Sequence, residues 1–124
     1  MGSISVDLPM PTSTNRIWRA NTRTGKPYLN PTYAKWKNAA DVELLRQRVG
    51  KGWRQITGPF DVHLVVSVAK RFKMDIDNRI KGVLDWAKNA GLILDDKYQN
   101  RVVLEWGDVP LGVRLTLTPS KDFS

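Results

Sequence analysis

Apolar and polar residues alternate in four segments of the chain, with the two-residue period of a half-buried β-strand. These segments are residues 4–8, 61–69, 101–106 and 113–118. In the second segment the even-numbered residues from Val62 to Val68 share one face, so we expect a central strand with that face in the core. The last two segments are joined by a turn-like sequence containing Gly107 and Pro110, which predicts a closing β-hairpin.

A three- and four-residue apolar period, typical of an amphipathic helix, replaces the alternation in two other segments. The first is residues 32–49, which follow Pro31 and end before Gly50. Its apolar positions are Tyr33, Trp36, Ala40, Leu44 and Leu45. The second runs roughly over residues 78–89 and stops at a turn that contains Gly91. Residues 12–28 are basic and polar, and they predict an extended loop suited to following a phosphate backbone.

The expected elements follow one another as β-α-β-α-β-β, without a repeat. This order predicts an α+β fold in which a mixed sheet of about four strands is covered by two helices. The 124 residues fit a single core, and 41% hydrophobic content is ample for a folded domain. We therefore expect one domain over residues 1–118 and a polar tail over residues 119–124.

The chain has no cysteine, which excludes disulfides and thiolate metal sites and is compatible with a reducing compartment. It also has no apolar run of the ~20 residues that a membrane span needs, and no signal-peptide pattern at its start. We therefore expect a cytoplasmic protein without a membrane partner. Whether its source is a cell, a virus or a prophage stays open.

The net charge of +8 is unevenly distributed, because five of the twelve acidic residues lie between Asp75 and Asp96. A basic body around an acidic site suits a polyanion that must meet a cation. Charge alone equally allows non-specific nucleic-acid binding or simple solubility.

Asp75 and Asp77 are two residues apart, a spacing that points both carboxylates to the same side of an extended strand end. Two carboxylates on one side suit Mg²⁺ or Mn²⁺, which keep waters and phosphate oxygens as their other ligands. The alternative is that Asp77 or Asn78 caps the second helix without any metal.

Lys81 follows Asp77 by four residues, which predicts that both lie on one helical face. The pair is explained either by a structural ion pair or by a lysine that offsets charge on a metal-bound phosphate. Asp85 continues this face, and we expect it to support the structure by pairing with Lys81 or Lys88. Because the chain returns after the second helix, the adjacent Asp95 and Asp96 are expected near the start of that helix. Three clustered carboxylates require a bound cation or raised pKa values. His63 is expected to be structural.

Taken together, these residues make the chain similar to the RusA family of Holliday junction resolvases. The matching positions near the start are Leu8, Pro9, Pro11, Ser13, Asn15 and Arg16. The matching positions in the acidic stretch are Asp75, Asp77, Asn78, Lys81, Asp85, Gly91, Asp95, Asp96 and Gln99. The resemblance covers most of the chain. The family's arginine-rich run before the first acid is replaced here by the sequence from Lys70 to Met74.

The resemblance implies that Asp75, Asp77 and Asp96 are metal-binding catalytic acids and that Lys81 is an essential catalytic lysine. It also implies a homodimer that cuts four-way junction DNA with paired nicks, using Mg²⁺ or Mn²⁺ and no organic cofactor. Asn78, Asp85 and Asp95 are then supporting residues. The residues expected to contact DNA are Asn15, Arg16, Arg19, Lys70, Arg71 and Lys73.

Two alternatives remain from the sequence. One is a non-catalytic basic DNA-binding protein, in which the acids cap a helix and form surface pairs. The other is a metal nuclease that acts on flaps or forks, because phosphodiester chemistry does not by itself specify the DNA architecture. Trp53 is a candidate platform for an unpaired base, although an aromatic residue in a small domain is more often part of the core.

Overall fold

A computed structural model describes residues 2–12, 18–20, 23, 25–71 and 76–120 of the chain. Its strands are β1 (Ile4–Leu8), β2 (Trp18–Ala20), β3 (Pro27–Leu29), β4 (Phe60–Ser67), β5 (Gln99–Gly107) and β6 (Val113–Pro119). Its helices are α1 (Pro31–Gln47) and α2 (Ile80–Asn89). Three short 3₁₀ turns complete the order: η2 (Val68–Lys70), η3 (Ile76–Arg79) and η4 (Asp96–Tyr98). The α+β class and the order of the main elements are confirmed.

The main sheet has four strands in the order β1-β6-β4-β5. β4 pairs in parallel with β5 and antiparallel with β6, so the sheet is mixed and β4 is central, as expected. The predicted hairpin of β5 with β6 is wrong, because β4 lies between them. Crossing one strand requires about 10 Å, and the five residues 108–112 span up to about 16 Å, so the short connection does not force the two strands to pair.

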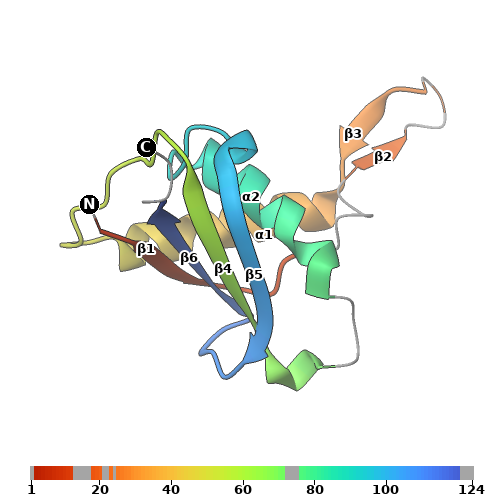
Figure 1. The fold of residues 1–124 in the computed structure, drawn as a ribbon. Coiled ribbons are helices and arrows are strands. Elements are labelled where there is room, and N and C mark those ends of the chain that lie inside the picture. Colours follow the sequence, from red (N-terminus) through yellow and green to blue (C-terminus); the bar gives the residue numbers. More distant parts are fainter. Residues whose placement is uncertain (1, 13–17, 21–22, 24, 72–75, 121–124) are drawn as a thin grey trace.

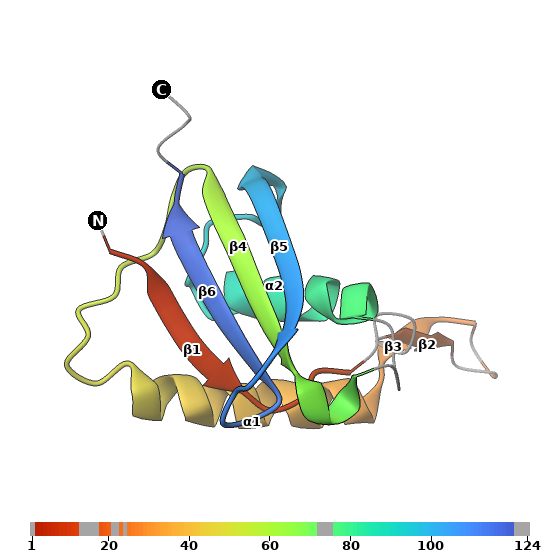
Figure 2. The same ribbon diagram turned by 60° about the horizontal axis from the view of Figure 1, so that its bottom comes forward.

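The extended loop predicted over residues 12–28 is also wrong, since β2 and β3 pair antiparallel there. Trp18 lies opposite Leu29, and Ala20 lies opposite Pro27. Each strand has three residues, which is too short for alternation to reveal it. The hairpin projects from the body of the molecule in both ribbon views (Figure 1, Figure 2).

α1 begins one residue before the predicted start and ends two residues before the predicted end, at Gln47. Pro31 lies in its first turn, and the Asn30 side chain accepts a hydrogen bond of 2.9 Å from the Thr32 backbone N–H. It buries Tyr33, Trp36, Ala40 and Leu44. Leu45 was expected on the same face, but it is 65% exposed. One residue turns the helix by about 100°, so Leu44 and Leu45 do not both face the sheet.

Both helices cover the same face of the sheet (Figure 1, Figure 2). The core between them is formed by Ile4, Val6, Leu8, Val62, Leu64, Val66, Val113, Leu115 and Leu117 from the sheet, together with Trp36, Trp86 and Ala87 from the helices. Val68 was expected to continue the buried face of β4, but it is exposed because the strand ends at Ser67. The Ser67 hydroxyl accepts a hydrogen bond from the Ala69 N–H and starts η2.

The uncovered face of the sheet carries polar and charged side chains. His63 on β4 contacts Glu105 on β5, with 3.0 Å between Nε2 and Oε1, and Asp7 on β1 binds Arg114 on β6 with an oxygen–nitrogen distance of 2.8 Å. In the part of the chain that the structure describes, no helix is long and apolar enough to cross a membrane.

Candidate active site

α2 positions the candidate catalytic lysine. Its apolar positions are buried against the sheet and α1, which leaves Lys81 and Asp85 on its outer side. Two side-chain hydrogen bonds fix α2 against α1: the Tyr33 hydroxyl donates to the Gly82 carbonyl at 2.8 Å, and Trp86 Nε1 donates to Asp41 Oδ1 at 2.8 Å. The helix that carries Lys81 is therefore held against α1 directly after the lysine, at Gly82, and one turn further on, at Trp86.

Lys81 lies between two carboxylates that come from different elements. Its Nζ is 3.6 Å from Asp85 Oδ1, one helical turn further along α2, and 3.9 Å from Asp96 Oδ2 at the start of η4. The predicted return of the chain after Gly91 therefore brings Asp96 back beside the first turn of α2. The sequence predicts that Lys81 pairs with Asp77 or with Asp85, each of which is four residues away. In the structure the partner at this spacing is Asp85.

A backbone bridge that sequence reasoning missed holds this returning segment. The Ile56 N–H donates to the Leu92 carbonyl, and the Leu94 N–H donates to the Ile56 carbonyl, both at 2.9 Å. Leu92 and Ile93 are buried, so the segment is anchored directly before Asp95 and Asp96. Ile56 stands alone among polar residues in the sequence, and such an isolated apolar residue gives no periodic signal.

Asp95 and Asp96 are adjacent but have different surroundings. The Lys97 N–H donates to Asp95 Oδ1 at 3.0 Å and caps η4, while Lys88 Nζ lies 3.4 Å from Asp95 Oδ2. The Lys97 hydrogen bond, the Asp96 side chain and the charge of Lys88 lower the pKa of Asp95 below its ordinary value. Asp95 is therefore bound locally, and Asp96 is the member of the pair that faces Lys81.

The geometry expected for the first two acids is wrong where the structure describes it. β4 ends at Ser67, and Asp77 lies exposed in the 3₁₀ turn η3, so it does not leave a strand end. The capping alternative for Asp77 or Asn78 is also wrong, because the N-cap of α2 is Arg79 and it makes no side-chain capping bond. Asp75 lies outside the described residues.

The predicted DNA contacts are only partly within the described residues. Arg19 lies in β2, Lys70 ends η2, and Arg71 follows it exposed. Asn78, which was predicted as a supporting residue, lies in η3. Asn15, Arg16 and Lys73 lie outside the described residues. The structure thus places Lys81, Asp85 and Asp96 together, and it leaves the grouping of the remaining site residues as a prediction.

Within residues 2–12, 18–20, 23, 25–71 and 76–120, no three His, Cys, Asp or Glu side chains gather closely enough to hold a metal. The described part of the predicted metal set consists of Asp77 and Asp96, whose carboxylate oxygens are the ligand type that Mg²⁺ and Mn²⁺ prefer. The third predicted ligand, Asp75, would have to complete the set. The chemistry of the donors therefore fits a hard divalent cation.

Comparison with known proteins agrees with the resemblance seen in the sequence. No protein with a curated description matches the chain. The model of the family described as endodeoxyribonuclease RusA matches residues 8–118, which run from the last residue of β1 almost to the end of β6 and include every element of the candidate site. The chain therefore belongs to the RusA endodeoxyribonuclease family.

Proposed function

We propose that the protein resolves four-way DNA junctions by paired, metal-dependent hydrolysis of phosphodiester bonds. Membership of an endodeoxyribonuclease family supports internal cleavage of DNA. The observation that carries the catalytic proposal is the position of Lys81, with Nζ 3.6 Å from Asp85 and 3.9 Å from Asp96. This brings a cation and a carboxylate from two separate elements to one exposed place, where a phosphate can reach both.

Asp75, Asp77 and Asp96 would hold Mg²⁺, for which Mn²⁺ would substitute. The distance of 3.9 Å between Lys81 and Asp96 is too long for a hydrogen bond, so the Asp96 lone pairs are not taken up by the lysine. When held there, the cation would supply Lewis-acid polarisation of the phosphodiester and would lower the pKa of the attacking water.

Lys81 supplies positive charge for the phosphate oxygens as charge builds on them during hydrolysis. Asp85 keeps the lysine side chain extended along α2 through the four-residue ion pair. Because the buried face of α2 is fixed by Tyr33 and Trp86, the lysine is presented from a rigid helix rather than from a loop.

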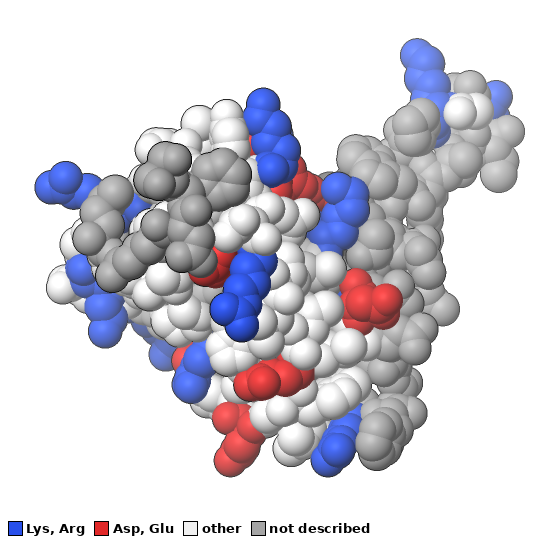
Figure 3. All heavy atoms as spheres, in the orientation of Figure 1, with Lys and Arg blue, Asp and Glu red and all other residues white. Residues whose placement is uncertain are grey.

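The surface charges favour DNA contacts on the projecting hairpin rather than on the uncovered sheet face. On that face Asp61 lies beside Arg101, and both Glu105 and Arg114 flank Val65. Figure 3 shows this mixture of acidic and basic side chains, and it shows basic side chains at the far end of the projecting hairpin. Arg23 and Lys26 are the described, exposed basic residues between β2 and β3. Together with Arg19 and the segment from Lys70 to Lys73, they would contact phosphates.

A cleavage assay tests the function. Purified protein is incubated with a labelled four-way junction, with Mg²⁺ or with EDTA, in competition with flaps, forks and linear duplex. We expect symmetric nicks on the junction only with the metal, and loss of cleavage in Asp96→Asn but not in the matched control Asp108→Asn. Preferred cutting of flaps or forks would instead support a metal nuclease that acts on those structures. Metal-independent DNA binding without any cleavage would favour a non-catalytic DNA-binding protein.

We further propose that the active form is a homodimer. A four-way junction has approximate two-fold symmetry, and a two-fold enzyme presents two equivalent sites to it. Sedimentation is the direct measurement, and the expected mass is twice the 14.1 kDa of the chain.

A further inference from the structure

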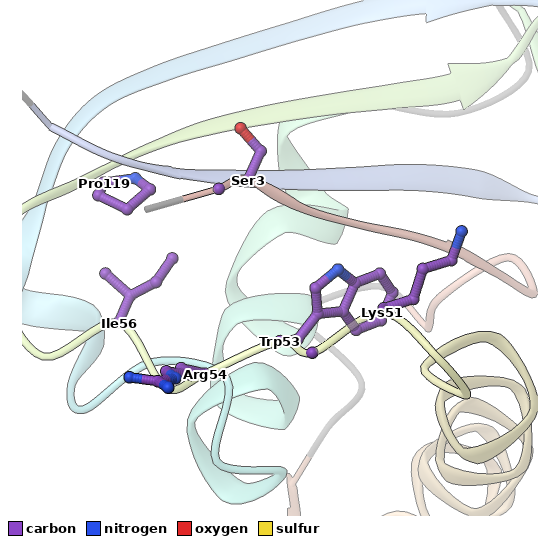
Figure 4. A pocket seen from close by; sticks show the side chains of 8 residues that line it. Ser3, Lys51, Trp53, Arg54, Ile56 and Pro119 are labelled. Atoms are coloured by element: carbon purple, nitrogen blue, oxygen red, sulfur yellow. The ribbon is translucent and has the colours of Figure 1, made fainter.

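A hollow of about 270 Å³ lies between the chain end that enters β1, the loop after α1 and the end of β6. Its walls include Ser3, Lys51, Trp53, Arg54, Ile56 and Pro119 (Figure 4). In Figure 4 the Trp53 indole rises from the loop beside the Lys51 side chain, and Ile56 points toward Pro119. None of these residues belongs to the candidate active site.

The lining combines apolar surface with positive charge. Trp53, Ile56 and Pro119 supply an aromatic and two aliphatic surfaces, and the described residues that line the hollow include two cations and no acid. The Lys51 and Arg54 side chains leave the loop in different directions, so they lie on either side of Trp53 (Figure 4). The volume is below the range of about 300–1,000 Å³ that holds drug-sized ligands, and it suits one flat ring.

We propose that this hollow binds an unpaired nucleotide of single-stranded DNA. The base stacks on Trp53, and the phosphates that precede and follow it contact Lys51 and Arg54. An aromatic platform flanked by cations is the general chemistry of single-strand binding, since every base has a π-face and every linkage carries a negative charge. A duplex does not satisfy this arrangement, because its bases are already stacked and paired.

The conformation of the loop over residues 50–56 holds Trp53 in place. Gly50 and Gly52 both have positive φ, 73° and 65°, which form the turn that reverses the chain after α1. Trp53 packs partly against the core, and three residues later Ile56 is bonded by its backbone to Leu92 and Leu94. Gln55 Nε2 also donates to the Ile93 carbonyl at 3.4 Å.

The same backbone bridge fixes the segment that leads to Asp95 and Asp96. The Trp53 loop and the segment that carries Asp95 and Asp96 are therefore connected by a pair of backbone hydrogen bonds, which would hold a strand leaving a junction, flap or fork at a fixed position relative to the cleavage site. The binding itself does not depend on the proposed metal site. It is measured in EDTA, so that its outcome is independent of cleavage.

The test uses the full chain and a short fluorescein-labelled oligothymidylate, followed by anisotropy at several salt concentrations. Stacking contributes about 1–3 kcal/mol per base, so Trp53→Ala is expected to weaken single-strand binding at least about five-fold, while Trp53→Phe retains most of the affinity. Lys51→Ala and Arg54→Ala are each expected to reduce the slope of log K against log salt by about 0.7. Lys35→Ala removes an exposed lysine of α1 as the matched control, and it is expected to leave that slope unchanged.

Single-strand binding by a folded Trp53→Ala protein with wild-type affinity would overturn the proposal. If Trp53→Ala weakened single-strand and duplex binding equally, the proposal would also be overturned, because the site would then be a general DNA contact. If Trp53→Ala does not fold, the two charge variants and Trp53→Phe decide the matter. In that case, equal salt slopes for Lys51→Ala, Arg54→Ala and Lys35→Ala would count against the site.

Discussion

The ion pair between Lys81 and Asp85 contributes little to folding. The lysine side chain is 61% exposed, and exposed four-residue pairs on helices are worth only about 0.3–0.5 kcal/mol. Asp96 lies further away still and pairs with the same ammonium. Stability therefore does not account for three charged side chains converging here, whereas the proposed charge stabilisation of a reacting phosphate would.

Replacing Lys81 separates these two contributions. In Lys81→Met we expect junction cleavage to fall by about 100-fold or more, because the charge that meets the phosphate is lost while the aliphatic stem remains. The free energy of unfolding should change by less than about 0.5 kcal/mol. Lys88→Met is the matched control on the same helix, since Lys88 pairs with Asp95 instead. An active Lys81→Met enzyme would remove the lysine from the mechanism.

Asp95 gives a pH-dependent prediction. Its pKa in the folded protein is below the ordinary 3.8, so the charged carboxylate favours the folded state above that pH and loses this contribution as the pH falls through the folded pKa. Asn retains the capping oxygen but not the charge. We expect the stability difference between wild type and Asp95→Asn, measured by urea unfolding, to be constant down to about pH 4 and to shrink below it. A difference that grows in acid would contradict this account.

The sequence predicted the return of Asp96 because that return needs only a helix of known length followed by a turn. It did not predict the arrangement of Asp77, because the helical period gives no information about a 3₁₀ turn that precedes the helix. The separation of roles between Asp95 and Asp96 depends on one backbone N–H, that of Lys97, and no pattern of residue types reveals it.

At the scale of elements, α1 and α2 are joined by the phenol of Tyr33. Burial, and then the charge of Asp85, raise the pKa of Tyr33 to about 12. The neutral phenol therefore favours the folded state below pH 10, and this contribution is lost as the pH rises from 10 through 12. The packing of the helices under the candidate site is thus expected to weaken in strong base.

Tyr33→Phe tests this connection. The Gly82 carbonyl loses its donor, so we expect a loss of about 1 kcal/mol in unfolding free energy at neutral pH. In an ultraviolet titration of the three tyrosines, the latest ionisation should disappear from the variant. If all three tyrosines of the wild type titrate near pH 10, the phenol is not buried as described.

The junction of β1, β4 and β6 depends on Gly112. Its N–H donates to the Leu8 carbonyl, and its carbonyl accepts from the Ser67 N–H, both at 2.9 Å. A Cβ at this position would overlap backbone atoms of Met10. Backbone atoms, unlike the end of a flexible side chain, cannot move aside easily. We expect Gly112→Ala to lose about 1–3 kcal/mol in thermal or urea unfolding. Gly58→Ala is the control, because a Cβ there meets no atom within 4 Å, and equal stability of both variants would refute the crowding.

Strand pairing shows where sequence patterns stop being informative. The alternation located the four strands of the sheet, and the buried face of β4 was predicted residue by residue from Val62 to Val66. Alternation does not specify neighbours, so β5 and β6 were paired with each other although each pairs with β4. β5 is an edge strand whose first four residues are exposed, and its burial does not alternate strictly as that of β4 does. Its residue pattern therefore does not indicate which strand it pairs with.

At the scale of the whole molecule, both helices cover one face of the sheet, and the candidate site lies on the outer side of α2. A single chain presents one copy of the site formed by Lys81, Asp85 and Asp96, so two strand cuts at one junction require either two chains or two successive events. In the proposed homodimer the two cuts belong to two subunits and occur within one binding event.

A mixed dimer distinguishes these possibilities. Wild-type and Lys81→Met chains carrying different affinity tags are co-expressed and purified in tandem, with a doubly tagged wild-type dimer as the control. On a supercoiled plasmid with an extruded cruciform, the control should give linear DNA, because both strands are cut before the complex dissociates. The mixed dimer should give nicked circles, since its single active subunit cuts one strand and the released supercoiling then reabsorbs the cruciform. Linear DNA from the mixed dimer would show that one subunit makes both cuts, and it would exclude the assignment of one cut to each subunit.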